Sequence, residues 1–356
     1  MRRIISLCLT RWGELFHLGK SVSSKEIKQK ALHCGYVACG IIPSTAFSEY
    51  KQYLDERVNT FPGSKNFYEN MYGMVNPDDN AKSIIVCTQR YNRYKVPASL
   101  EGMIGKFYMF DGRVPYSQEF RAKTEFETWL KLNGINILKC GIPARWAAAK
   151  AGLGKFGRNN FIYSPEHGSY IWIESWAVDV ELECDALQNE IYLSNCNDNC
   201  EKCIKACPTK ALSGKLSMDM GKCITRLVCS AKDIPNEEIR PLMGSWIYGC
   251  DMCQSACPLN KGKFAETEEF PLLSEFEEYL KPENILEMDD DTYQNIVNPR
   301  FWYSGKEGVW RWKCNALRCM INSGDKKYLG LVKKYCDHED ERIREIAQWG
   351  CRILQE

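Results

Sequence analysis

The 356-residue sequence predicts a mixed α/β fold, followed by a cysteine-rich segment and a helical C-terminal region. In the first half of the chain, helical patterns alternate with short apolar runs, which is typical of an α/β layer. Cysteines gather in residues 196–257 at spacings that recur. From residue 307 onward the apolar pattern is helical throughout. A chain of this length can form two or three domains with a sizeable core.

Composition says little about partners but indicates a compartment. A formal net charge of +1 gives no global case for a nucleic acid or an acidic partner. Nineteen cysteines, most of them without framework spacing, suit a reducing environment. No apolar run approaches the length of a membrane-spanning helix. We therefore expect a cytoplasmic protein that does not engage a membrane.

The first 20 residues need separate treatment. Arg2 and Arg3 begin the chain as an export signal can, but Arg11 and Glu14 interrupt the apolar stretch and no small-residue cleavage site follows. A short amphipathic helix, or a start codon placed too far upstream, explains the segment better. Residues 1–20 are treated as uninformative about the fold.

The first elements of the α/β layer follow from local patterns. Residues 24–34 fit a helix that begins at a serine and carries Ile27 and Ala31 on one face. Gly35 ends it, and residues 36–42 read as a buried strand. The later elements expected on the same grounds are helices at 50–58, 120–132 and 145–150, strands at 82–88 and 134–138, and two strands within 161–179 about a turn at 165–168.

A glycine-rich loop follows the helix predicted at 145–150. Three glycines occur within six residues, and a cation and amides come next; the residues concerned are Gly152, Gly154, Gly157, Arg158 and Asn159. Such a loop lets backbone approach a bulky ligand closely. The dinucleotide fingerprint sits between a strand and a helix. Here the glycines follow a helix, so we reject a nicotinamide site.

The cysteine-rich segment supplies eight thiolates, the number needed for two [4Fe–4S] clusters. Two runs end in Cys-x3-Cys-Pro, and one cysteine lies between them. In bacterial two-cluster ferredoxins the cysteine before the proline serves the other cluster. By that rule the first cluster would be held by Cys196, Cys200, Cys203 and Cys257, and the second by Cys207, Cys223, Cys250 and Cys253.

Two other uses of these cysteines are weaker. Zinc sites take four ligands in tetrahedral geometry, and Cys-x3-Cys-Pro endings are not typical of them. Disulfide frameworks belong to small secreted domains, and this chain is neither small nor visibly secreted. One irregularity remains, because the first gap is Cys-x3-Cys where the ferredoxin pattern has Cys-x2-Cys. Either the loop carries an extra residue, or Cys184 substitutes for Cys196.

The C-terminal third reads as an acidic, helical connector over 264–280 and then as helices at 309–321, 328–335 and 341–354. The last helix repeats apolar residues on one face, as in a helical-repeat unit. From residue 295 onward there are twelve Lys or Arg against eight Asp or Glu. This region is either a solvated capping domain or a phosphate-contacting surface. In the second case the nearby aromatic residues are Phe301, Trp302, Tyr303, Trp310 and Trp312.

Residues 24–354 resemble the epoxyqueuosine reductase family. The resemblance rests on the glycine loop, on Gly168-Ser169, on residues 179–183, on the Asn322–Asp325 junction and above all on residues 240–260. The last run includes Arg240-Pro-Leu-Met-Gly244 and Cys257-Pro-Leu-Asn260. The glycine loop alone is also similar to reductive dehalogenases.

The resemblance implies a fold, cofactors and a substrate. Beyond residues 1–20, it implies an α/β cobalamin-binding domain at 21–185, a double [4Fe–4S] ferredoxin-like domain at 186–262 and a HEAT-like helical domain at 263–356. Base-off cobalamin would lie between the first two domains and receive electrons from the clusters, which an external low-potential donor would reduce. The substrate would be epoxyqueuosine in a tRNA anticodon loop. The cofactor-binding candidates are Arg145, Gly152, Gly154, Gly157, Arg158, Asn159 and Ser169.

The sequence also departs from that family. An ungapped alignment places Leu138 where the family has an aspartate taken to be the proton donor, and Ala144 replaces a glutamate. Arg158 stands where the reductases usually have lysine. Removing an epoxide oxygen leaves an alkoxide that must be protonated, so another acid is needed. The candidates are Tyr108, Asp111, Tyr116 and Cys140.

Three functions therefore remain open. The first is a cobalamin-dependent iron–sulfur reductase of the epoxyqueuosine type. The second is a dehalogenase-like enzyme acting on a small molecule, which the missing aspartate and Gly157-Arg158-Asn159 favour. The third is a non-catalytic corrinoid-binding or electron-carrier protein, which the loss of the acid favours.

Overall fold

The computed structural model describes residues 22–194, 196 and 199–355. Its centre is a four-stranded sheet in the order β1-β2-β6-β3, and every neighbouring pair is antiparallel. The strands are β1 (Ala38–Pro43), β2 (Ser83–Arg90), β6 (Ile171–Val178) and β3 (Ile137–Leu138). Residues 1–20, which the sequence leaves uninterpreted, lie outside the described residues.

Helices cover both faces of this sheet, because β2 and β6 bury side chains on both. Along β2, Ile84 and Val86 enter one hydrophobic core while Ile85 and Cys87 enter another, as the alternation of a strand requires. The first core contains α3 (Ser48–Thr60), α4 (Lys65–Glu69) and α7 (Ala144–Lys150). The second contains α2 (Ser24–Cys34) and α6 (Gln118–Leu132).

Capping explains where the two helices of the second face begin. Ser23 and Glu26 form a capping box at the start of α2, and Gly35 ends that helix at a φ of 109°. The hydroxyl of Ser117 accepts a hydrogen bond from the backbone N–H of Phe120 at the start of α6.

A small hairpin follows α7. It consists of β4 (Lys155–Phe156) and β5 (Ile162–Tyr163), which pair antiparallel. Two strands are present within 161–179 as predicted, but β5 pairs with β4, whereas β6 joins the main sheet. A bridge between Ser164 and Gly168 closes the turn that separates them.

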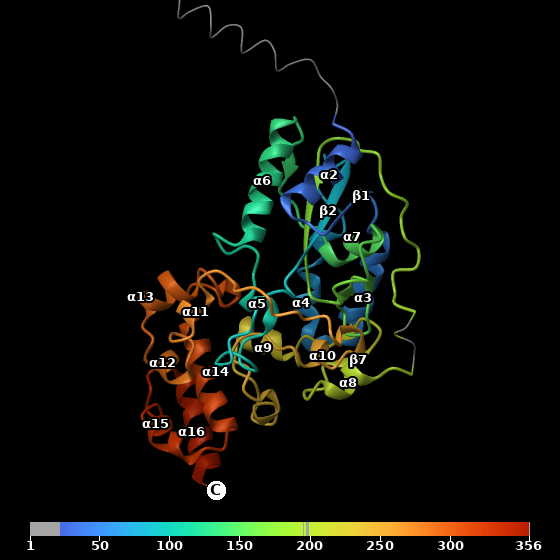
Figure 1. The fold of residues 1–356 in the computed structure, drawn as a ribbon. Coiled ribbons are helices and arrows are strands. Elements are labelled where there is room, and N and C mark those ends of the chain that lie inside the picture. The colour runs from blue at the N-terminus through green and yellow to red at the C-terminus, as the bar shows by residue number, and fades with distance from the viewer. Residues whose placement is uncertain (1–21, 195, 197–198, 356) are drawn as a thin grey trace, which may run out of the picture.

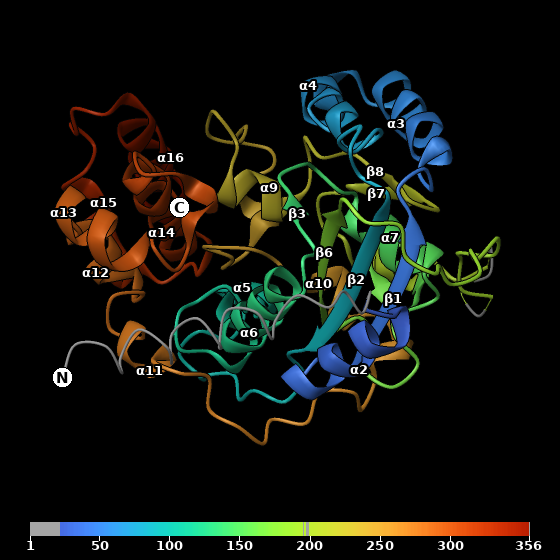
Figure 2. The ribbon, with the colours of Figure 1, turned by 90° about the horizontal axis from the view of Figure 1, so that it is seen from above.

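Short elements make up the cysteine-rich segment. They are α8 (Lys202–Ala206), β7 (Leu212–Gly214), β8 (Ser217–Met218), α9 (Ile224–Cys229) and α10 (Met252–Ser255). Of these, α9 lies between the sheet and the C-terminal helices, together with α5 (Lys106–Met109) (Figures 1 and 2).

The C-terminal region is helical, but its connector is not. The helices are α11 (Leu273–Phe276), α12 (Pro282–Glu287), α13 (Asp290–Thr292), α14 (Val309–Asn322), α15 (Leu329–Lys333) and α16 (Glu341–Gln355). A helix over 264–280 was the expectation, and only α11 forms there. Residues 265–268 instead run extended beside 92–95, because Lys95 N donates to the Glu268 carbonyl (2.8 Å).

A seam of buried polar side chains joins α14 to the cysteine-rich segment. The amide of Asn315 donates to the carbonyls of Val228 and Ile247, each at 3.0 Å. Arg318 is 1% exposed and donates to the carbonyls of Gly244 (2.7 Å) and Trp246. The run beginning at Arg240 is therefore held in place by α14.

Two of the aromatic residues expected near a phosphate-contacting surface are in the core. Phe301 and Trp312 are each 1% exposed, and their rings pack against Tyr248. The sequence could not separate them from Tyr303, which is 39% exposed.

Candidate functional site

Four cysteines of the first predicted set lie together. Burial and the neighbouring thiols of Cys196, Cys257 and Cys200 raise the pKa of Cys203 to about 11. Cys203 lies in α8, and the short 3₁₀ turn over Pro258–Asn260 follows Cys257. The structure therefore brings together the four cysteines that the crossed pattern assigns to one cluster.

The second set lies beside the first. Burial, and then Cys223, Cys250 and Cys207 in that order, raise the pKa of Cys253. Cys203 of the first set also acts on Cys253, so the two sets adjoin. All eighteen described cysteines are free thiols. Among the described residues, no three His, Cys, Asp or Glu side chains converge as the ligands of a single metal ion would. The four thiolates of a [4Fe–4S] cluster do not need to converge in this way, because each of them binds a different iron.

Cys196 and Cys184, the two alternatives for the first ligand of the first cluster, have different surroundings. The Cys196 thiol accepts a hydrogen bond from the backbone N–H of Arg158 (3.3 Å). Cys184 is exposed, donates to the Leu182 carbonyl, and has Asp185, Glu181 and Lys28 as its charged neighbours. The structure thus places Cys196, and not Cys184, with the other thiols.

The glycines of the loop serve the chain's own hairpin. A Cβ on Gly154 would lie 2.6 Å from Ile162 Cγ2, and one on Gly157 would lie 2.5 Å from the Tyr163 ring. Gly152 has a φ of 74°, which favours glycine. The absence of a Cβ at Gly154 and Gly157 therefore makes room for the strand β5, and the cofactor contact of these glycines stays a prediction.

Asn159 and Ser169 belong to one buried network that reaches the cysteines. The Asn159 amide donates to the Tyr163 hydroxyl and to the Cys253 carbonyl, both at 2.9 Å. Tyr163 also interacts with the Ser169 hydroxyl, which accepts hydrogen bonds from Gln254 and Asn260 (2.9 Å each). This network fixes the hairpin against residues 250–260.

Asn160, the next residue of the loop, contacts α7 and α3 instead of the cysteines. Asn160 has a φ of 70°, in the left-handed region, and its carbonyl accepts a hydrogen bond from Arg145 (2.6 Å). Its side chain interacts with the hydroxyl of Tyr53, which lies on α3. Arg145, Arg158 and Asn159 are thus brought into one region, together with Tyr53, which sequence reasoning missed.

Arg57 is a second residue that the sequence did not indicate. It is 8% exposed, and its guanidinium lies 5.3 Å from the centre of the Tyr53 ring. Its Nε is buried without a hydrogen-bond partner among the described residues. An unpaired buried donor of this kind indicates a missing acceptor. Only its spacing of four residues from Tyr53 could have linked the two in sequence.

The four proton-donor candidates lie in different places. Tyr116 is 74% exposed, and Asp111 is 2% exposed and bound by Arg113 through two hydrogen bonds of 3.0 and 2.8 Å. Tyr108 packs against Tyr248, with the thiols of Cys229 and Cys223 near it. Cys140 packs at the edge of the core that contains α7. The structure does not bring the four together.

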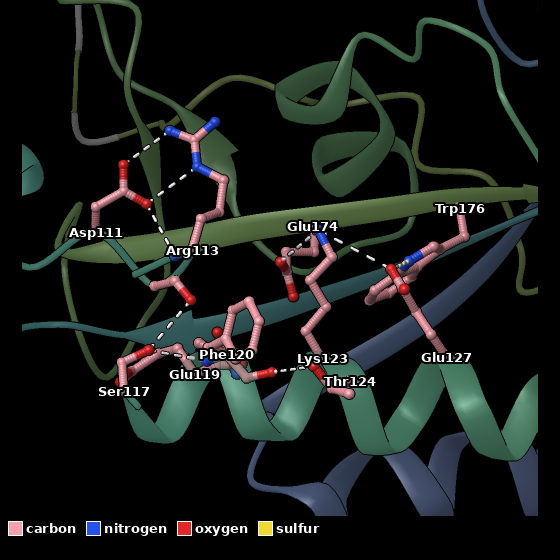
Figure 3. Close-up of polar contacts among 12 residues, drawn as sticks. Asp111, Arg113, Ser117, Glu119, Phe120, Lys123, Thr124, Glu127, Glu174 and Trp176 are labelled. Carbon is pink, nitrogen blue, oxygen red and sulfur yellow. Dashed lines mark hydrogen bonds and ion pairs between the residues drawn. The ribbon is translucent and has the colours of Figure 1, made fainter. Parts of the chain in front are cut away.

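A cavity of about 170 Å³ opens on the other face of the sheet, between β6 and α6. Figure 3 shows Lys123 reaching from α6 toward Glu174 and Glu127. Burial raises the pKa of Glu174, and its hydrogen bond from Tyr36 opposes that effect. None of the candidate cofactor or cluster residues lines this cavity.

Comparison with known proteins places the chain in a family. Residues 195–260 match a family described as a 4Fe-4S double cluster binding domain. An epoxyqueuosine reductase of Leadbetterella byssophila is 31% identical over 264 residues, which are 69% of this chain and 83% of that protein. The chain belongs to the epoxyqueuosine reductase family.

Other members of the epoxyqueuosine reductase family are similar over different lengths. The enzyme of Cellulophaga algicola is 27% identical over 78% of this chain and 92% of its own length. That of Bacillus subtilis is 30% identical over 58% of this chain and about half of its own length, 52%. The match to the double-cluster family gives this chain iron–sulfur clusters, and its relatives are named as reductases, so it is an iron–sulfur oxidoreductase.

Solved structures of epoxyqueuosine reductases share the mixed α/β fold. The Streptococcus thermophilus structure superimposes with a TM-score of 0.71 at 21% identity, covering 93% of this chain and 90% of that one. A second, described with an epoxyqueuosine-modified tRNA stem loop, has a TM-score of 0.66 at 21% identity and covers 93% and 98%. Within the described part of the chain, no helix has the length and apolar character that a membrane span requires.

Proposed function

We propose that this protein uses cobalamin and two [4Fe–4S] clusters to deoxygenate epoxyqueuosine in a tRNA anticodon loop. The observation that carries the proposal is the position of residues 158–160. Arg158 N–H binds the Cys196 thiol, the Asn159 amide binds the Cys253 carbonyl, and Asn160 meets Arg145 and Tyr53. One short segment therefore touches both sets of cluster cysteines and the polar side chains beyond them.

The residues beyond the clusters fit a corrinoid. Its rim carries amides and a phosphodiester, which need donors, and Arg57 offers a buried nitrogen without a partner among the described residues. Arg57 and Arg145 would hold that rim, with the rings of Tyr53 and Trp146, 5.7 Å apart, beside it. When bound, cobalamin supplies a low-valent cobalt that accepts electrons from the clusters and reacts with the epoxide. The fit to Arg57, Arg145 and Asn160 supports the cofactor assignment.

The chemistry of this reaction sets what the protein must provide. An epoxide, two electrons and two protons give an alkene and water. Two reduced [4Fe–4S] clusters supply one electron each, and an external low-potential donor restores them. The protein must exclude water from the reduced centre and deliver a proton to the leaving oxygen.

Exposed lysines at the C-terminal end of the molecule support the tRNA part of the proposal. Lys326, Lys327, Lys333 and Lys334 are exposed in and around α15. Lysines placed in this way neutralise phosphates without reading sequence. In this proposal they hold the stem while the modified base enters the site.

The experiment is anaerobic purification with cobalamin, followed by a visible spectrum, an iron count and an assay on tRNA that carries epoxyqueuosine. We expect cobalamin uptake, about eight irons per chain, and formation of queuosine. Absence of cobalamin uptake would contradict the proposal. Uptake without turnover would favour the carrier role, which Leu138 at the position of the family's aspartate also favours.

A further inference from the structure

Tyr53 lies where α3 meets α7, on the face of the sheet that carries the glycine loop. Its ring stacks on Tyr50 (5.8 Å between centres, 15° between planes) and packs against Trp146 of α7 (5.7 Å). Tyr53 is partly exposed, unlike Leu54 beside it, which is fully buried. The ring is therefore held firmly while one edge remains open.

Two guanidinium groups and two hydrogen-bonding side chains surround the Tyr53 hydroxyl. Arg57 lies over the ring, 5.3 Å from its centre, and Arg145 acts on the phenol from α7. The hydroxyl interacts with the side chains of Asn160 and Tyr68. Tyr68 in turn donates to the carbonyl of Met218 in the cysteine-rich segment.

This group is joined to the cluster cysteines through three consecutive residues. Asn160 contacts Tyr53, Asn159 donates to the Cys253 carbonyl, and Arg158 donates to the Cys196 thiol. Asn160 has a φ of 70°, in the left-handed region that an L residue rarely adopts. Residues 158–160 therefore contact the cluster cysteines at one end and Tyr53 at the other.

The four proton-donor candidates predicted from the sequence do not combine a contact to residues 158–160 with neighbouring guanidinium groups. Asp111 is fully engaged by Arg113, Tyr116 lies on an exposed turn, and Tyr108 packs beside the cluster cysteines. Cys140 lies in the β3–α7 connection, at the edge of the core that contains α7.

We propose that the Tyr53 hydroxyl is the proton donor of this enzyme, with Arg57 and Arg145 stabilising the phenolate that remains. The inference rests on the proposed epoxide reduction. Two cluster electrons break the carbon–oxygen bonds, Tyr53 gives one of the two protons to the leaving oxygen, and water gives the other. Solvent then reprotonates Tyr53.

The balance of charges around Tyr53 suits that role. Burial raises the pKa of Tyr53, which keeps the phenol protonated at neutral pH, while Arg145 and Arg57 oppose that rise. The other ionisable groups near it are the phenols of Tyr50, Tyr68 and Tyr192. The carboxylates of Glu49 and Glu56 also act on Tyr192, and Glu56 lies 3.3 Å from the Arg57 guanidinium. Arg145 is therefore the main cation that can stabilise a phenolate at Tyr53, and Arg57, which Glu56 partly neutralises, adds to it.

The first test compares Tyr53→Phe with Tyr50→Phe in the holoenzyme. Both substitutions remove one hydroxyl from the same aromatic stack, but the Tyr50 hydroxyl donates to Met71 Sδ (3.5 Å). We expect Tyr53→Phe to lower kcat on epoxyqueuosine tRNA by about 10²–10⁴-fold, with iron content, cobalamin uptake and cobalt reduction unchanged. Tyr50→Phe should stay within about threefold of the wild type. Turnover of Tyr53→Phe near the wild-type rate would overturn the assignment.

The second test does not depend on turnover. In protein labelled with ¹³C at the tyrosine ring, the signal lost in Tyr53→Phe identifies Tyr53 among the 18 tyrosines, and its pH titration gives its pKa. We expect the Tyr53 phenol to stay protonated through neutral pH. Its pKa should be higher in Arg145→Met than in the wild type, and it should not be lower in Tyr68→Phe than in the wild type. A phenol already ionised at pH 7, or one unaffected by Arg145→Met, would refute the role. If the wild type failed to reduce epoxyqueuosine, the proposed function would fall on its own.

Discussion

The side-chain amide of Asn159 donates a hydrogen bond to the backbone carbonyl of Cys253, 2.9 Å away. The glycine loop and the second cysteine run are separated by almost a hundred residues, yet this bond fixes one against the other. The same amide reaches the Tyr163 hydroxyl, so Asn159 also ties the hairpin β4–β5 to the cluster cysteines.

Replacing Asn159 should therefore loosen the hairpin from the clusters. Asn159→Leu keeps the volume but leaves the Cys253 carbonyl and the Tyr163 hydroxyl without this donor. We expect a loss of about 1–3 kcal/mol of stability, seen as a lower anaerobic unfolding temperature and faster iron release. The control is Asn295→Leu, which removes an exposed amide bonded only to Asp291. Equal effects of the two variants would contradict this expectation.

Single cysteine replacements should separate the two clusters. Cys196→Ala and Cys253→Ala are each expected to lose one cluster, so that anaerobic iron falls from about eight to about four per chain. Cys184→Ala should keep about eight, because its neighbours are Asp185, Glu181 and Lys28. Iron and sulfide counts on the three variants test this prediction. If Cys184→Ala alone lost iron, Cys184 and not Cys196 would be the cluster ligand.

The seam between α14 and the cysteine-rich segment should be sensitive to loss of Asn315. In Asn315→Leu the carbonyls of Val228 and Ile247 lose a buried donor. We expect destabilisation of about 2–6 kcal/mol, since each of the two unsatisfied buried carbonyls costs about 1–3 kcal/mol. Thermal unfolding measures it. Asn284→Leu, an exposed amide that donates to Glu278, is the control and should change stability by less than about 0.5 kcal/mol.

Glu174 should make stability depend on pH. Burial raises its pKa in the folded protein above the ordinary value of 4.5, so the folded state binds more protons than the unfolded state just above pH 4.5. Stability from this group is thus greatest below the unfolded pKa and falls as pH rises through the folded pKa. Unfolding temperatures of the wild type minus those of Glu174→Gln, taken from pH 4 to 8, should decrease across that window. A difference that grows with pH would show the opposite sign.

Charge reversal near α15 tests the tRNA surface. Lys333→Glu with Lys334→Glu should weaken binding of the anticodon stem loop and reduce the slope of log affinity against log salt by about 1–2. Lys25→Glu, on α2 at the far end of the molecule (Figure 1), is the control and should leave both quantities unchanged. Fluorescence anisotropy at several salt concentrations measures them. An unchanged slope in the double variant would exclude these lysines from the contact.

The sequence alone could predict the elements whose signal is local. Strand β2 and helices α6, α7 and α16 form within a few residues of the expected positions, because apolar periodicity and capping act over one or two turns. The ferredoxin-like spacing predicts that Cys257 joins the first cysteine run, and the structure places Cys257 near Cys203, while the ligand assignment itself stays a prediction. The helix expected over 264–280 failed because residues 265–268 pair with 92–95, a long-range contact that overrides local propensity.

The rest of the candidate site depends on contacts that no local pattern carries. Tyr53 and Arg145 are more than 90 positions apart and meet only because α3 and α7 cover the same face of the sheet. The close contact of Gly154 and Gly157 with the strand β5 could not be read from their spacing either.

One hydrophobic core contains residues from all three of the large segments that the sequence divides at 185 and 262. Tyr91 and Phe110 come from the first, Val228 from the second, and Trp312 from the third. Cutting the chain at 262 would expose this shared interior and the carbonyls that Asn315 and Arg318 serve, and cutting it at 185 would expose the shared interior. The predicted boundaries therefore do not mark pieces that can be exchanged or produced separately. Loss of the last helix should be felt at the iron–sulfur centres themselves, so damage at one end of this protein becomes a redox defect at the other.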